Sequence, residues 1–329
     1  MNHTNNFKQT NMTSYAYRLL GAAALALSAC GAEAQAPYPA KNVEVILPYA
    51  AGGGVDAMAR AFAREAARVT GQNWIVVNRE GAGGIVGFTA LSRATPDGYT
   101  LAFSPASPMV NSPFVMKDMP FRNEQIEPLC QIFENVFSIA VRQDSPIQSM
   151  QDLVARAKAA PGKLSYGHAG AGSVPHMSVG ALEKALGVKF NPIAYRGDGP
   201  MLPQLIGGEL DFGAPALSSI AGKNLRVLAV LSDKRSPAAP DAPSITQLGY
   251  PAVTPGLNGL YAPAGLPKPL VEQLQGVCRT VVASEGFVKA ASTLQQVPAY
   301  LPAAQFRARL EGTFKTNAEL VPDLKLEKN

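Results

Sequence analysis

The chain has 329 residues, of which 47% are hydrophobic and only 16% are charged, and this composition excludes an intrinsically disordered protein. Neither a charged heptad pattern nor a Gly-X-Y period is present, which excludes a coiled coil and a collagen-like chain. The net charge of +5 comes without a dense Lys/Arg run, so we expect no nucleic-acid partner. The length fits about two domains of roughly 150 residues each.

Residues 1–29 have the features of a signal peptide. A polar, basic segment precedes the apolar run Leu19–Ala29, which is far shorter than the roughly 20 residues that span a bilayer. Two cleavage sites compete: a bacterial lipobox that ends at Cys30, which would carry the lipid, and an ordinary site at Ala32-Glu33-Ala34. We favour the lipobox because Cys30 directly follows the apolar run. The sequence thus predicts an exported, periplasmic protein whose contact with a membrane would be a lipid anchor.

Two further cysteines, Cys130 and Cys278, remain after the leader. An exported protein can form a disulfide between them, but the sequence does not test the required Cα separation. We expect two separately buried thiols. Since there is no C-x-x-C motif and no Cys/His cluster, we expect neither a metal nor a cofactor.

The first part of the body alternates strands with helices. Apolar runs predict strands at Val43–Leu47, Trp74–Val77 and Tyr99–Phe103. Helical spacing predicts a helix from Val55 to Val69, and a glycine loop at Gly81–Gly87 precedes a short helix to Arg93. This β-α-β-α-β order predicts a parallel sheet covered by helices.

The middle of the chain repeats this style with different loops. Strands are predicted at Phe137–Val141, Leu164–Gly167, Asn191–Tyr195, Leu210–Ala214 and Leu225–Leu231. Ser149-Met150-Gln151-Asp152 resembles a capping box and predicts a helix to Ala160. Later, a strand at Gly259–Ala262, two helices and an amphipathic segment at Pro302–Glu319 are expected. The chain is therefore predicted to be α/β with two lobes, and the C-terminal helices could return to the first lobe.

Three glycine-rich loops each follow a strand and open a helix: Ala50–Asp56, Gly167–His176 and Tyr195–Pro200. The first N–H groups of a helix have no partner within it, and together with the helix dipole they favour an anion. Because ligands of open α/β sheets lie at the carboxyl ends of strands, loops from both lobes could hold one carboxylate across a cleft. The alternative is that each loop is only a tight turn whose helix is capped by Asp56 or Ser173.

The sequence lacks several motifs that are typical of enzyme active sites. No P-loop, G-x-S-x-G, S-x-x-K or H-E-x-x-H pattern is present. His168 and His176 flank Ser173, so a secreted α/β hydrolase-like enzyme that uses Ser173 and His176 is the alternative function. No acidic orienting residue is near in sequence, and we expect no catalytic residue and no enzyme activity.

Several motifs in order carry a family resemblance. They are Tyr49-Ala50-Ala51-Gly52-Gly53-Gly54-Val55-Asp56, Asn78-Arg79-Glu80-Gly81-Ala82-Gly83-Gly84, Pro96-Asp97-Gly98-Tyr99, Ala169-Gly170-Ala171-Gly172-Ser173, Tyr195-Arg196-Gly197 and Gly207-Gly208-Glu209-Leu210-Asp211. In these residues the chain resembles the Bug family, the extracytoplasmic solute-binding receptors of tripartite tricarboxylate transporters. The resemblance spans nearly all of residues 38–320.

The resemblance implies a two-lobed, type II periplasmic-binding-protein-like fold with the ligand cleft between the lobes. Residues 37–140 and 251–329 would form a discontinuous first lobe, and residues 141–250 the second. The function implied is the capture of a small carboxylate, by a monomer, for a tripartite tricarboxylate-type membrane permease or a sensor kinase.

The family's first glycine loop holds a carboxylate through backbone amides and ordered waters, and the second-lobe loops add further groups. Carried over to this chain, the implied ligand-binding residues are Tyr49, Ala51, Gly52, Gly53, Gly54, Asp56, Ser104, Ser173, His176, Tyr195, Arg196, Gly197 and Asp198. Two positions depart from the family. Arg196 replaces the usual Lys, and its guanidinium would either bind a second carboxylate or point to solvent. Leu257 stands where relatives commonly have Trp, which would alter a pocket wall.

Overall fold

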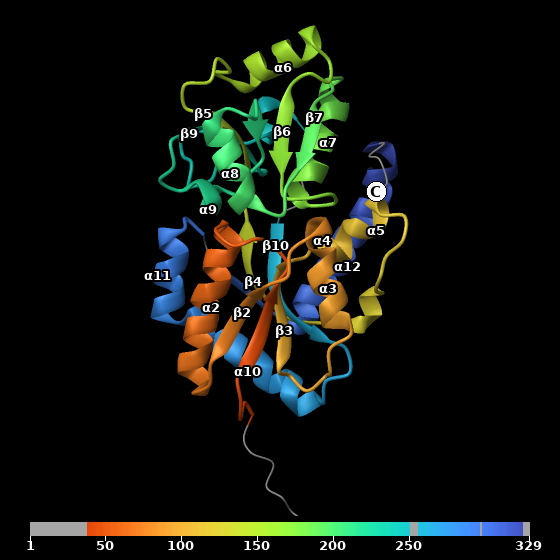
Figure 1. Ribbon diagram of the computed structural model, residues 1–329, viewed down its shortest axis with the longest axis vertical. Coiled ribbons are helices and arrows are strands. Elements are labelled where there is room, and N and C mark those ends of the chain that lie inside the picture. The colour runs from red at the N-terminus through yellow and green to blue at the C-terminus, as the bar shows by residue number, and fades with distance from the viewer. Residues whose placement is uncertain (1–37, 251–255, 297, 325–329) are drawn as a thin grey trace, which may run out of the picture. The chain divides into compact units, whose positions relative to one another are not determined.

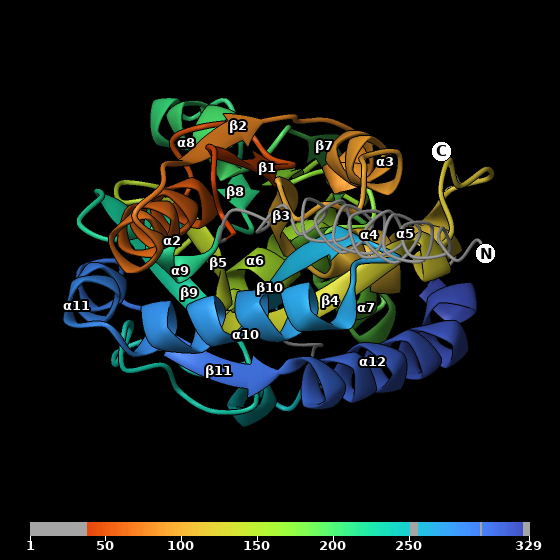
Figure 2. The same cartoon turned by 90° about the horizontal axis from the view of Figure 1, so that it is seen from below.

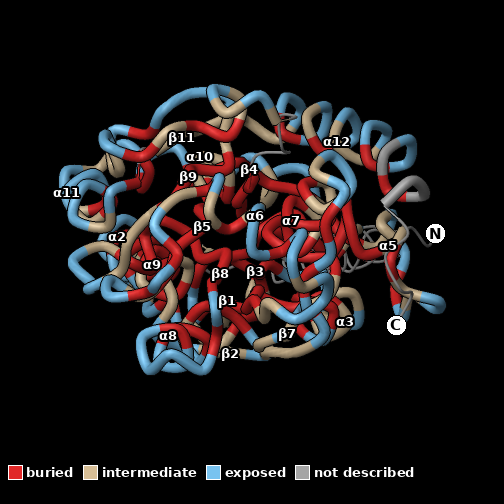
Figure 3. Tube along the Cα trace, turned by 90° about the horizontal axis from the view of Figure 1, so that it is seen from above, coloured by how far each residue is buried: buried red, intermediate tan, exposed pale blue. Residues whose placement is uncertain are grey.

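The computed structural model describes residues 38–250, 256–296 and 298–324, and the account below concerns the unit formed by residues 41–329. The predicted signal peptide and Cys30 lie outside the described residues. Within the unit, two β-sheets with helices on both faces form two lobes (Figure 1). Most strands lie in the interior, whereas the edge strand β7 (Asn191–Ala194) is largely exposed, and the helices turn exposed sides outward (Figure 3). Within the described residues, no helix is both long and apolar enough to cross a bilayer.

The larger sheet has six strands in the order β11-β4-β10-β3-β1-β2. Their bounds are β1 Val43–Leu47, β2 Trp74–Asn78, β3 Thr100–Pro105, β4 Ile126–Asn135, β10 Gly256–Pro263 and β11 Pro298–Pro302. β1 pairs in parallel with β2 and β3, which confirms the predicted β-α-β-α-β unit. β10 then runs antiparallel to β3 and β4, and β11 antiparallel to β4, so the sheet as a whole is mixed.

Helices cover both faces of this sheet. Their bounds are α2 Gly54–Thr70, α3 Ile85–Ser92, α4 Ser107–Val110, α5 Ser112–Val115, α10 Lys268–Ala283, α11 Glu285–Thr293 and α12 Ala303–Leu324, with short 3-10 turns at η1 Ala82–Gly84 and η2 Asn123–Gln125. α10 and α11 pack on α2, whereas α12 packs with α4 and β4 (Figure 2). On the α2 side, the Phe62 ring lies 5.6 Å from Phe103 and 6.2 Å from Phe287. On the other side, Tyr261 contacts Phe88 and Phe306. Each face of the sheet therefore has its own aromatic core.

The smaller sheet has five strands in the order β7-β6-β8-β5-β9. The elements of this lobe are β5 Phe137–Arg142, α6 Met150–Ala159, β6 Ser165–His168, α7 Val174–Leu186, β7 Asn191–Ala194, α8 Asp198–Gly207, β8 Phe212–Gly213, α9 Leu217–Ile220, β9 Leu225–Leu231 and η3 Thr246–Leu248. Alternate residues of β5 face opposite sides, because successive strand side chains do so. Ile139 joins a core with α6 and α7, and Ala140 joins a second core with α8 and α9.

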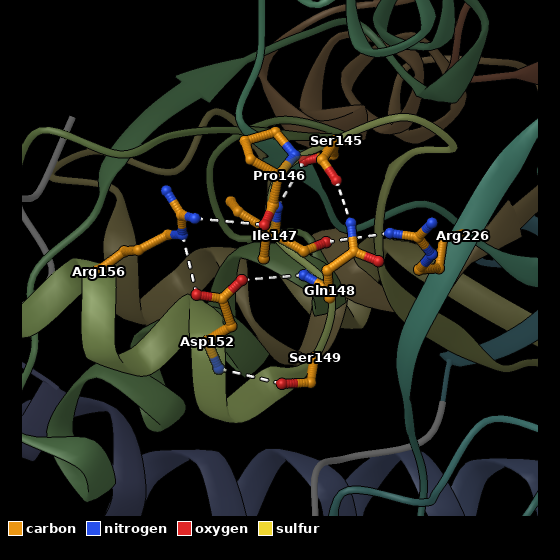
Figure 4. A network of polar contacts seen from close by, with 8 residues as sticks. All are labelled: Ser145, Pro146, Ile147, Gln148, Ser149, Asp152, Arg156 and Arg226. Carbon is orange, nitrogen blue, oxygen red and sulfur yellow. Dashed lines mark hydrogen bonds and ion pairs between the residues drawn. The ribbon is translucent and has the colours of Figure 1, made fainter.

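The start of α6 tests the predicted capping box. Ser149 is the N-cap, and its Oγ accepts a hydrogen bond from the Asp152 N–H at 3.1 Å. The Asp152 carboxylate accepts from the Gln148 N–H at 3.0 Å and pairs with Arg156 (Figure 4). The cap is confirmed, but the reciprocal bond reaches one residue further back than the motif predicts.

Cys130 of β4 and Cys278 of α10 form a disulfide with a Cα–Cα distance of 6.7 Å. The expectation of two separate thiols was wrong. The two residues lie 148 positions apart in sequence, and α10 packs directly on β4. Only this packing brings their Cα atoms within bonding range.

Candidate functional site

The loops that follow β1, β6 and β7 meet at one place between the two sheets (Figure 1). They line a partly open cavity of about 40 Å³, which has room for roughly three water molecules. The first turns of α2, α7 and α8 all reach this cavity. Its walls are Tyr49, Ala50, Gly53, Gly54, Val55, Asp56, Pro105, Ser107, Asn135, Phe137, Ala169, Ser173, Val174, Pro175, Gly197, Asp198 and Ala216.

The two lobes touch each other through backbone at this cleft. The Ala50 N–H donates to the Arg196 carbonyl at 2.8 Å. A Cβ placed on Gly83 would lie 2.2 Å from the carbonyl oxygen of Ala171, and one placed on Gly199 would lie 2.2 Å from that of Ala51. Real Cβ atoms do not come so close, so Gly83 and Gly199 are required for this approach. The structure is therefore of a closed arrangement, in which part of the glycine content serves contact between lobes.

The first loop is held by its own side chains. Asp56 pairs with Arg60 at 2.9 Å and accepts hydrogen bonds from Asn78 and from the Gly52 N–H. Burial alone would raise the pKa of Asp56, but the bonds from Arg60, Asn78 and Gly52 outweigh it and lower the pKa below its ordinary value. The Tyr49 hydroxyl donates to the Gly83 carbonyl at 2.9 Å and ties the two glycine loops of this lobe together.

Ser173 and His176 stabilise the second loop. The Ser173 side chain caps α7 by accepting from the His176 N–H, and the His176 Nδ1 accepts from the Gly172 N–H at 3.2 Å. The His176 ring stacks on His168 with centroids 4.4 Å apart. Burial lowers the pKa of His176 to about 4, so the ring is neutral near pH 7.

In the third loop, the neighbouring residues Arg196 and Gly197 have different surroundings. Gly197 has φ 130° and lines the cavity, where its backbone passes beside Tyr49 and Ala50. Arg196 turns away: its guanidinium, 72% exposed, pairs with Glu80 of the other lobe at 3.1 Å. Tyr195 is half-buried and packs against the core beneath α8.

A chain of buried hydrogen bonds crosses the cleft from α2 to α8. The Gly54 N–H donates to the Ser219 Oγ at 2.9 Å, and the Ser219 hydroxyl donates to Asp198 Oδ2 at 2.6 Å. Asp198 Oδ2 also accepts from the Ala216 N–H at 3.0 Å. Asp198 Oδ1 is buried and has no hydrogen-bond partner in the described part of the protein. Burial raises the pKa of Asp198 above its ordinary value, and the bonds from Ser219 and Ala216 act against that rise.

The structure brings seven of the predicted site residues to the cavity wall: Tyr49, Gly53, Gly54, Asp56, Ser173, Gly197 and Asp198. The other predicted residues, Ala51, Gly52, Ser104, His176, Tyr195 and Arg196, do not line it. Ala51 and Gly52 are exposed, and the buried Ser104 hydroxyl donates to the Pro105 carbonyl. Leu257 is core and also lies outside the cavity wall.

Sequence reasoning missed the cavity residues that come from the ends of β3, β4 and β8. Ser107, Asn135, Phe137 and Ala216 belong to no glycine loop, and Asn135 ends a strand that was not predicted. Turn signals were available for Ala216, which follows Pro215, and for Ser107, which precedes Pro108. Within the described residues, no cluster of three or more His, Cys, Asp or Glu could hold a metal ion.

Two α/β lobes that meet around a cleft are the architecture of two-lobed solute-binding proteins. Residues 58–324 match the model of the tripartite tricarboxylate transporter family receptor. The chain is 32% identical to the UPF0065 protein in the gbd 5′ region of Cupriavidus necator, over 93% of this chain and 94% of that protein. The chain belongs to the tripartite tricarboxylate transporter receptor family, which confirms the resemblance found in the sequence.

Solved structures agree with this assignment. The periplasmic binding protein BugD is 29% identical, with a TM-score of 0.83 over 89% of this chain and all of that chain. MatC from Rhodopseudomonas palustris, solved with bound malate, has a TM-score of 0.81 over 86% of this chain and all of that chain, at 23% identity. These likenesses confirm the predicted two-lobed periplasmic-binding-protein fold.

Proposed function

We propose that the chain is an extracytoplasmic receptor that captures a small carboxylate in the cleft between its lobes. The observation that carries this is the convergence of three helix starts, those of α2, α7 and α8, on one cavity. A helix start offers N–H groups and the positive end of its dipole to an anion. The malate bound by MatC, a protein of the same fold, supports the same ligand class.

The contacts between the lobes support capture by closure. Backbone from the first lobe lies against backbone from the second at Gly83 and Gly199, where no side chain would fit. A cavity with room for roughly three waters admits only a compact ligand group without opening. We infer that ligand enters an open form and that the Ala50–Arg196 and Gly54–Ser219 bonds form as the lobes close.

The hydrolase alternative has no support in the geometry or the comparisons. The Ser173 hydroxyl serves as a helix cap, and the His176 Nδ1 accepts from backbone. A histidine whose pKa is about 4 is also a weak general base near pH 7.

We further propose export to the periplasm by a signal peptide over residues 1–29, with a lipid on Cys30 as an anchor. The receptor would act as a monomer and hand its ligand to a membrane permease or signal through a sensor kinase. For the lobes we propose the division 37–140 with 251–329 against 141–250. This division is supported by the sheets, because β5 and β9 lie in the smaller sheet and β4 and β10 in the larger. Since β5 starts at Phe137, the chain first passes from one lobe to the other a few residues before position 140.

Isothermal titration calorimetry with mono-, di- and tricarboxylates, and with the fully amidated, neutral analogue of each as a control, tests this function. We expect one-site binding of at least one carboxylate, no binding of its amide analogue, and no consumption of ligand. Consumption that Ser173→Ala abolishes would refute the binding function, and so would a panel in which no carboxylate binds.

Gly53 offers a matched pair of variants. Its φ of −86° suits any residue, and a Cβ there would make ordinary contacts of 3.6 Å with Asp198 and Gly199. Gly53→Ala should therefore retain binding, whereas Gly53→Leu should abolish it because the longer side chain fills the cavity. Retained affinity in Gly53→Leu would contradict the role of the first loop.

A further inference from the structure

Two buried polar atoms of the cavity wall have no hydrogen-bond partner among the described residues. Asp198 is 9% exposed and Asn135 is 3% exposed, and both line the cavity. Asp198 Oδ1 is an acceptor with no partner, and Asn135 Nδ2 is a donor with no partner, in the described part of the protein. Burial without a hydrogen bond costs each group free energy, so such atoms in a cleft point to a ligand that completes them.

The other oxygen of Asp198 is fully used, which fixes the carboxylate in place. Oδ2 accepts from the Ser219 hydroxyl and from the Ala216 N–H. On Asn135, the Oδ1 atom accepts from Gln296 at 3.2 Å. In each side chain, one polar atom is hydrogen-bonded within the protein, and the other polar atom has no partner among the described residues.

The charges on the cavity wall determine which ligand group can form a hydrogen bond with Asp198. Among the described residues of the wall there is no Lys, Arg or His. Asp56 is neutralised by Arg60, so Asp198 is the carboxylate of the wall without a cationic partner. In its ionised form Asp198 would repel a second anionic group, whereas an ammonium or a hydroxyl would donate to it.

We propose that Asp198 is a specificity-determining residue that accepts a hydrogen bond from a donor group of the ligand, an ammonium or a hydroxyl. Asn135 Nδ2 donates to an oxygen of the same ligand. The receptor thus selects compact amino or hydroxy carboxylates over plain carboxylates of the same length. This inference rests on the proposed function of carboxylate capture.

Titration of the wild-type protein with succinate, L-malate and L-aspartate tests the proposal directly, because these four-carbon diacids differ at one carbon by hydrogen, hydroxyl or ammonium. A hydrogen bond to a buried charge changes affinity by about tenfold to 100-fold. We expect malate or aspartate to bind at least about tenfold more tightly than succinate. Preference for aspartate identifies an ammonium, and preference for malate a hydroxyl. Equal affinities would overturn the proposal while leaving carboxylate capture intact, whereas a panel of carboxylates that all fail to bind refutes the proposed function itself.

Asp198→Asn sharpens the test without changing the size of the side chain. The Ala216 N–H and the Ser219 hydroxyl require an acceptor, so the amide oxygen takes the Oδ2 position and the amide NH₂ faces the cavity. The variant then presents a donor where the wild type presents an acceptor, and the preference for malate or aspartate over succinate should fall at least about tenfold. Asp144→Asn, on a carboxylate that is 73% exposed, is the matched control and should keep the wild-type preference. An unchanged preference in a folded Asp198→Asn protein would overturn the proposal.

Discussion

Gly83→Ala should impair ligand binding because it holds the lobes apart. The added Cβ would lie 2.2 Å from the Ala171 carbonyl oxygen, and real contacts of this kind stay above 3.0 Å. The two loops must therefore separate by about 0.8 Å, the difference between these distances. Ala171 belongs to the second lobe and Gly83 to the first, so the strain falls on the closed arrangement.

The size of the effect follows from the bonds that span the cleft. The Ala50–Arg196 bond at 2.8 Å and the Gly54–Ser219 bond at 2.9 Å both require close approach of the loops. At about 1 kcal/mol each, their loss would weaken binding by about 2 kcal/mol, or roughly 30-fold in Kd.

Gly187→Ala is the matched control for backbone strain. Gly187 and Gly83 both have a φ of 63°, but a Cβ on Gly187 would meet nothing within 4 Å. Both variants should lose about 1–2 kcal/mol of stability from the left-handed conformation, and only Gly83→Ala should lose affinity. Calorimetry with the tightest ligand of the succinate, malate and aspartate series makes the comparison. Equal Kd values for the two variants would refute the argument that close approach at Gly83 supports capture.

Three further predictions concern stability and the third loop. Burial lowers the pKa of His168 to about 3 and that of His176 to about 4, against 6.5 in the unfolded chain, with the neighbouring imidazole adding to the shift at His168. As the pH falls, the histidines of the unfolded state are protonated before those of the folded state. The free energy of unfolding should therefore fall by roughly 2 kcal/mol per histidine between pH 6.5 and pH 5. A free energy of urea unfolding that does not change between pH 7 and pH 5 would contradict this. Replacing Cys130 and Cys278 together by Ser should cost about 2–5 kcal/mol in urea unfolding under non-reducing conditions, and thiol labelling of the unfolded, unreduced wild type should find neither residue reactive. Arg196→Ala should change Kd less than about fivefold, because the exposed ion pair contributes at most about 1 kcal/mol, and a loss of 100-fold by calorimetry would show that Arg196 binds ligand.

The sequence predicted best where local pattern decides the structure. Val43–Leu47 and Leu225–Leu231 form strands with the predicted bounds, because mostly apolar runs rich in Val and Leu favour buried strands even when one charged residue interrupts them. Gly71 follows the predicted helix Val55–Val69 closely and ends α2 in the left-handed conformation, which glycine adopts readily. These features need no information from distant parts of the chain.

Prediction failed where pairing with a distant segment decides. β4 contains Pro128 and several polar residues, and it forms because β10 and β11 pair with its two edges. Pro128 is tolerated because the register with β10 shifts beside it. The disulfide depends in the same way on the packing of α10 against β4.

In the candidate site too, features set by local sequence could be predicted, and contacts with distant segments could not. The glycine loops predicted where the cleft is, since strand, turn and helix start adjoin in sequence. Asp198 was expected at the site, but its hydrogen bonds to Ala216 and Ser219 could not be predicted, because these partners come from a short segment after β8. Ser173 lines the cavity, whereas the Arg196 side chain turns outward to pair with Glu80 of the opposite lobe, and this contact with a distant segment could not be read from the sequence.

A crystal structure of the mature protein with its tightest carboxylate tests the central claim most directly. The account predicts that the ligand lies in the closed cavity between the lobes, with a carboxylate oxygen within hydrogen-bond distance of backbone N–H groups at the starts of α2, α7 or α8. A ligand bound outside this cavity, or bound within it with no carboxylate at any of these helix starts, would contradict the account.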